Sequence, residues 1–171
     1  MSRSILKYSY SMILGLSLLS AGCNGNKSEQ NGNPNTMETT TNAIFPKGEQ
    51  GSKDYFTGTV WVTPLLSKDK NNEFSIGNVV FEPGARANWH THPKGQVLIV
   101  TEGNGFYQEE GKQAQKIKKG DVVNIPENTK HWHGASAGSQ LVHLAITNFE
   151  DNVNVVWLEP VSDEDFDMVN K

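Results

Sequence analysis

The chain contains a single cysteine among its 171 residues. One cysteine excludes an internal disulfide framework and a zinc site built on four thiolates. The chain also lacks long blocks of like charge, since 19 acidic and 15 basic residues give a formal net charge of −4. Without a basic patch there is no electrostatic footprint for nucleic acid, and we expect no nucleic-acid partner.

No apolar run reaches the roughly 20 residues that a membrane-spanning helix needs. An apolar stretch at Met12–Leu19 follows Arg3 and Lys7 and precedes small residues that end at Cys23. This order is typical of a secretory signal peptide, and residues 1–22 resemble a bacterial lipoprotein signal, in which the cysteine is lipidated. We therefore expect an exported protein that is anchored to a membrane through Cys23 and faces the periplasm or the cell exterior. The alternative is ordinary secretion with an unmodified cysteine.

Large apolar residues are almost absent from residues 23–43, which are rich in Asn, Gly and Thr. Such a segment cannot bury enough surface to fold, so we expect a flexible tether. The folded domain is expected over residues 44–166, followed by a tail at 167–171. Within the domain only "SDEDFDMV" has a helix pattern, with Ser162 as its N-cap and acidic residues in its first turn.

Strand patterns dominate the rest of the domain. Short runs such as "GTVWVTPLL", "FSIGNVVFEP", "GQVLIVTEG" and "SQLVHLAIT" are rich in β-branched and aromatic residues and are separated by Gly, Pro and Asn. Many short strands predict an all-β antiparallel sandwich or barrel, an architecture that can enclose a small ligand.

All five histidines lie between residues 90 and 143 of this domain. His90 and His92 share one strand face because side chains alternate along a strand, and His131 and His133 form a second such pair. Gln96 follows the first pair with the same parity. Imidazole suits Mn, Fe, Ni, Cu and Zn, and an amide oxygen suits the harder ions of this set. A lone His-x-His pair also occurs on ordinary surface or core strands, so the interpretation as a metal site needs a second signal.

The spacing of two motifs supplies that signal. The first motif consists of Gly84, His90, His92, Gln96 and Gly103, and the second of Gly120, Pro126 and His131. Together they resemble the paired motifs of the cupin superfamily, and the resemblance covers residues 81–146 most closely. It implies a single double-stranded β-helix, a jelly-roll-like barrel. The helix pattern that begins at Ser162 adds a short C-terminal helix to this fold.

Two positions depart from the family pattern. Asn128 stands where the family has glycine, and asparagine tolerates the positive φ that such a turn requires. Gln96 stands where the family has glutamate. Four neutral ligands would leave a divalent ion with its full charge, which makes it a stronger Lewis acid and a more weakly held ion.

The string from "FEPGARANWHTHPKGQ" to "HWHGA" and "HLAI" resembles a narrower group of small bacterial cupins. Members of this group are identified as manganese-dependent hydroxynitrile lyases or as carboxymuconolactone-decarboxylase-associated cupins. The resemblance implies a divalent metal, manganese first, with iron, nickel or zinc as alternatives. It implies four metal ligands, which are His90, His92, Gln96 and His131. It further implies His143 as a general base and His133 as a residue that lines the pocket or orients a ligand.

Several functions follow from these predictions. The first is a metal-dependent lyase that cleaves a C–C bond or decarboxylates a small oxygenated substrate. Alternatives are a non-catalytic module that binds a metal or a metabolite, and an Fe(II) dioxygenase. His143 is equally well explained as a hydrogen-bond partner behind the ligands. By family analogy we expect a homodimer or a higher homo-oligomer.

Overall fold

The computed structural model describes residues 44–171 of the chain. The predicted signal peptide, the tether and the lipid anchor on Cys23 lie outside the described residues. Among the residues that are described, no helix combines the length and the hydropathy that crossing a bilayer requires.

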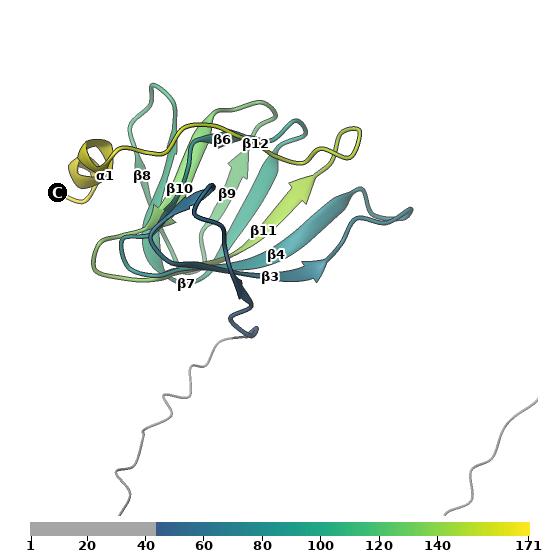
Figure 1. Cartoon of the computed structure of the whole chain (residues 1–171), viewed down its shortest axis with the longest axis horizontal. Helices are drawn as coiled ribbons and strands as arrows, with labels where there is room; N and C mark the ends of the chain where they lie inside the picture. Colours follow the sequence, from purple (N-terminus) through teal and green to yellow (C-terminus); the bar gives the residue numbers. More distant parts are fainter. Residues whose placement is uncertain (1–43) are drawn as a thin grey trace, which may run out of the picture. The chain divides into compact units, whose positions relative to one another are not determined.

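Twelve strands and one short helix build the described part of the chain (Figure 1). The strands are β1 (Glu49–Gln50), β2 (Phe56–Thr57), β3 (Val60–Leu66), β4 (Phe74–Phe81), β5 (Arg86–Ala87), β6 (His90–Thr91), β7 (Gln96–Glu109), β8 (Gln115–Lys118), β9 (Val122–Ile125), β10 (His131–Ala135), β11 (Leu141–Asn148) and β12 (Val156–Trp157), and the helix is α1 (Asp163–Val169). The pairs between these strands are antiparallel. The all-β prediction is confirmed.

One long strand joins the two layers of the barrel. The first half of β7 pairs with β11 and β9, next to β4, β3 and β1. The second half of β7 pairs with β8 and β10, next to β5, β6, β2 and β12. Figure 1 shows the resulting sheet curled over on itself. The predicted jelly-roll-like barrel is therefore observed.

The passage of β7 between the layers depends on glycine. Gly103 has a φ of +73°, and a Cβ at this position would lie 1.8 Å from the carbonyl oxygen of Gln140. The register between β7 and β11 also shifts by one residue at His143, which leaves Thr101 as an extra residue in β7. The bulge at Thr101 and the glycine at position 103 let the strand bend sharply. On both sides of the bend, side chains then point toward the interior.

Helix α1 covers the outer face of β10. Ser162 caps the helix by accepting a hydrogen bond from the backbone of Asp165, as predicted. Phe166 of α1 packs with Trp132 of β10, while the buried Arg86 donates to the carbonyl of Val161. Both faces of β10 are therefore buried, with its tryptophan outward under α1 and its histidines inward.

Candidate metal centre

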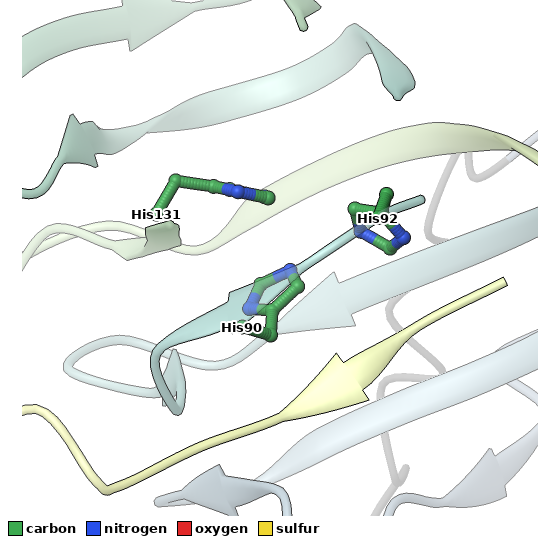
Figure 2. A group of neighbouring side chains, drawn as sticks. All are labelled: His90, His92 and His131. Atoms are coloured by element: carbon green, nitrogen blue, oxygen red, sulfur yellow. The ribbon is translucent and has the colours of Figure 1, made fainter. Parts of the chain in front are cut away.

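Strand pairing brings the first three histidines together inside the barrel. His90 of β6 lies directly opposite His131 of β10, so the two side chains share the inner face. His92 follows in the turn after β6, and all three histidines are buried. One ring nitrogen from each lies within 4.8 Å of the others. Figure 2 shows the three rings turned toward a common space.

Backbone carbonyls set the orientation of these rings. Nδ1 of His90 lies 2.8 Å from the carbonyl oxygen of Asn88, and Nδ1 of His131 lies 2.8 Å from that of Thr129. Nδ1 of His92 lies 2.5 Å from the carbonyl oxygen of Asn154. A carbonyl can only accept, so each Nδ1 carries the hydrogen and each Nε2 keeps a free lone pair. This arrangement is typical of metal-ligating histidines, whose second nitrogen is held by a carbonyl or a carboxylate.

Gln96 lies beside His92, and its amide oxygen is buried. Its Nε2 donates to the hydroxyl of Thr147 at 3.1 Å, which leaves Oε1 directed elsewhere. Oε1 of Gln96, Nε2 of His92 and Nε2 of His131 are all buried and have no hydrogen-bond partner among the described residues. Buried polar atoms are normally paired, so three such atoms in one place indicate a missing partner that accepts lone pairs.

Burial keeps these imidazoles neutral. It lowers the pKa of His131 to about 4 and lowers the pKa of His90 well below its usual value, with the neighbouring histidines acting in the same direction. The pKa of His92 is lowered by burial as well. A metal ligand must offer a free lone pair, and these shifts supply it at neutral pH. The donor set and its protonation state therefore fit a divalent metal ion.

A second histidine pair lies next to this group. His133 follows two residues after His131 on β10, and its ring centroid lies 5.4 Å from that of His90. His143 of β11 reaches the interior from the opposite layer, and its ring lies 4.9 Å from that of His133. Nδ1 of His133 and both nitrogens of His143 are buried without a hydrogen-bond partner among the described residues. Burial lowers the pKa of His143 to about 4 and that of His133 well below its usual value.

The turn before β10 contains the positive φ that was predicted for Asn128. Asn128 has a φ of +56°, the conformation expected for the residue that replaces the family's glycine. Its N–H donates to the carbonyl oxygen of His92 at 2.9 Å. The departure at this position therefore preserves the turn, and the turn ties the two motifs to each other.

Sequence reasoning missed three residues that border the site. Thr147 accepts a hydrogen bond from the amide of Gln96. The sequence could have indicated it, because a residue four positions after His143 on the same strand points to the same inner face. Trp157 lies opposite His90 in the pairing of β12 with β6, and no local pattern distinguished it from a core tryptophan. Tyr107 lies opposite His133, and burial raises the pKa of its buried phenol.

An open surface cavity lies elsewhere on the domain. It has a volume of about 660 Å³ and is formed by residues 44–47 together with outward residues of β4, β7 and β11, among them Val80 and Val142. None of the five histidines lines it. The metal-type donor set is thus an interior feature of the barrel, separate from this surface hollow.

Known proteins are similar to this domain in fold and in sequence. Residues 77–147 match the family described as Cupin domain. The chain is 46% identical to (R)-mandelonitrile lyase from Granulicella tundricola over 117 residues, which cover 68% of this chain and 89% of that protein.

Solved structures agree with this match. The crystal structure of a cupin-like protein from Thermotoga maritima is 49% identical, with a TM-score of 0.72, and the match covers 75% of this chain and 98% of that chain. A cupin 2 conserved barrel domain protein from Rhodopseudomonas palustris shares the fold at 22% identity, with a TM-score of 0.54 and coverage of 67% and 75% of the two chains. This chain therefore belongs to the cupin superfamily and, within it, resembles the hydroxynitrile lyase-like small cupins.

Proposed function

We propose that this domain is a metal-dependent lyase that breaks a carbon–carbon bond next to a hydroxyl-bearing carbon, with 2-hydroxynitriles as its substrate class. The observation that carries the proposal is the contact between a metal-type donor set and a second buried pair of histidines whose nitrogens have no partners. A structural metal site needs the first group alone. The similarity to the mandelonitrile lyase from Granulicella tundricola supports the choice of reaction.

In this proposal His90, His92, His131 and Gln96 hold the metal, with manganese as the first choice. A divalent ion at this position supplies Lewis acidity toward the hydroxyl oxygen of the substrate. Gln96 adds no charge to the donor set, so a divalent ion held there would keep its full positive charge.

His143 moves the proton. Burial holds its pKa at about 4, so its imidazole is neutral at pH 7 and can accept a proton. It takes the hydroxyl proton while the bond between the carbinol carbon and the nitrile carbon breaks and the carbonyl group forms. The electron pair of the broken bond leaves with cyanide. His143 then gives this proton to cyanide, which departs as hydrogen cyanide. The ring of His133 contacts the ring of His143 and orients it.

The test combines metal content with turnover. The full chain, purified without chelator and supplied with Mn²⁺, should release aldehyde and cyanide from 2-hydroxynitriles. His131→Ala should lose most of the bound metal, because one of the ligands is removed. His143→Ala should keep the metal and lose turnover by roughly 10²–10⁴-fold, the usual contribution of a general base.

Two outcomes would contradict these assignments. Loss of metal from His143→Ala would make His143 a ligand instead of a base. Stoichiometric metal without turnover of any hydroxynitrile would favour the alternative of a metal- or metabolite-binding module.

A further inference from the structure

Six rings beside the metal centre form a closed circuit of contacts. Three of them are the imidazoles of His90, His133 and His143, and the other three are apolar. In order around the circuit the rings are His90, His133, His143, Phe81, Phe56 and Trp157. Successive centroids lie between 4.8 and 5.9 Å apart, including the step from Trp157 back to His90. The interior beside the metal centre thus has one side of imidazoles and one side of hydrocarbon rings.

The hydrocarbon side reaches the surface. Phe81 is fully buried, whereas Phe56 and Trp157 are only partly buried and pack against the core. Tyr55, whose exposed fraction is 41%, stacks on Trp157 with ring centroids 4.8 Å apart and an interplanar angle of 17°. A continuous series of aromatic contacts therefore runs from solvent through Trp157 to the metal ligand His90.

Two further inward residues of this core are partly accessible to solvent. Val62 of β3 and Ala145 of β11 project inward, on the same sides of their strands as the buried Val60 and His143. Both nevertheless remain partly accessible and pack on the same core as Phe56 and Trp157. The inward side chains of this core that remain partly accessible are therefore apolar, as Phe56 and Trp157 are.

We propose that Trp157, assisted by Phe56, binds the substituent on the hydroxyl-bearing carbon of the substrate and makes the site select flat aromatic substituents over small aliphatic ones. This inference deepens the proposed lyase function and rests on it. With the hydroxyl at the metal centre and its proton near His143, the substituent has the hydrocarbon side of the circuit as its contact. Aromatic rings pack favourably on one another at centroid separations of 4.5–7 Å. Burial of the partly exposed Trp157 by a ligand adds hydrophobic stabilisation.

The chain offers a matched control for this tryptophan. Trp89 directly precedes His90 in the sequence and is also half-buried, but it packs on the opposite side, against the cluster that contains Trp132 and Phe166. Truncation of Trp89 removes the same side chain beside the same ligand without touching the circuit of rings. If the tryptophans only stabilise the metal centre, both truncations should have the same effect. If Trp157 contacts the substrate, only the truncation of Trp157 should change selectivity.

The first measurement is selectivity. For each protein the ratio of kcat/KM for mandelonitrile to kcat/KM for acetone cyanohydrin is determined, together with manganese content. Trp157→Leu should lower the ratio roughly tenfold, the effect of losing one well-packed substituent contact. Trp157→Phe should restore most of it, since a ring is again present, and Trp89→Leu should leave it unchanged. An unchanged ratio in Trp157→Leu with manganese retained would overturn the inference while leaving the lyase function intact.

A second measurement does not depend on turnover. Benzyl alcohol carries the hydroxyl and the ring but no nitrile, and calorimetry on the manganese-loaded chain gives its Kd directly. Binding should weaken in Trp157→Leu and not in Trp89→Leu; equal binding in the two would overturn the inference. If the wild type cleaves no hydroxynitrile, the lyase function fails and this comparison still decides the aromatic site. If Trp157→Leu loses its manganese, Phe56→Leu replaces it in both measurements, because Phe56 is separated from His90 by the ring of Trp157.

Discussion

Acidification should destabilise the metal-free protein, because its buried histidines are neutral in the folded state. A substitution of His143 measures how much of this loss of unfolding free energy comes from one histidine. Its side chain is fully buried, and burial lowers its pKa from 6.5 to about 4. Between these two values the unfolded chain binds a proton that the folded chain does not, so stability falls as the pH falls. The difference is worth about 3 kcal/mol in total. About 2 kcal/mol of it is lost between pH 7 and pH 5, since the folded-state pKa lies below that interval.

The assay is urea unfolding of the full chain in EDTA, followed by tryptophan fluorescence at pH 7 and at pH 5. The loss of unfolding free energy in the wild type should exceed the loss in His143→Leu by about 2 kcal/mol. Phe81→Leu serves as the control, because it removes packing against His143 but no titrating group, and it should show the full wild-type loss. Carboxyls such as Asp69 and Glu82, whose pKa values are lowered by their hydrogen bonds, titrate below this interval. Equal losses in the wild type and in His143→Leu would refute the reasoning.

Three further predictions concern the metal site and the bend of β7. Gln96→Glu should tighten manganese binding and slow hydroxynitrile cleavage, because a carboxylate adds charge to the donor set; an unchanged Kd in a metal titration would contradict this. Thr147→Val leaves Nε2 of Gln96 unpaired and should weaken manganese binding by about tenfold, with circular dichroism as the check on the fold. Gly103→Ala should lower the free energy of unfolding by more than about 2 kcal/mol, because its Cβ would meet the carbonyl oxygen of Gln140. Gly111→Ala, with the same φ of +73° and open space around it, should cost only about 1 kcal/mol in the same denaturation experiment.

Local spacing was enough to predict the class of fold and the core of the donor set. The alternation of side chains along a strand places His131 and His133 on one face of β10. The strand predicted for the first pair is shorter than expected, since β6 ends at Thr91 and His92 lies in the turn that follows. Turn residues are equally local, so the positive φ of Asn128 and the N-cap at Ser162 followed from residue chemistry. The predicted division of the chain near residue 166 falls within α1, which continues to Val169.

Long-range pairing decided what surrounds those ligands. Thr147 reaches Gln96 across 51 residues, and the carbonyl of Asn154 holds His92 across 62 residues. Neither contact leaves a local pattern, because the register between distant strands depends on the packing of the whole core.

The sequence by itself determined that this chain forms an all-β cupin barrel with a histidine-rich interior, since strand periodicity and the paired motifs are properties of short segments. Only the tertiary structure decided which nitrogens of those histidines are free, that His133 and His143 meet beside the metal centre, and that Trp157 packs against His90. The physical reason is that hydrogen-bond partners and burial are set by residues brought in from other strands. The residue type fixes which chemical groups a side chain carries. Its protonation state and its free lone pairs depend on the neighbours that folding places around it.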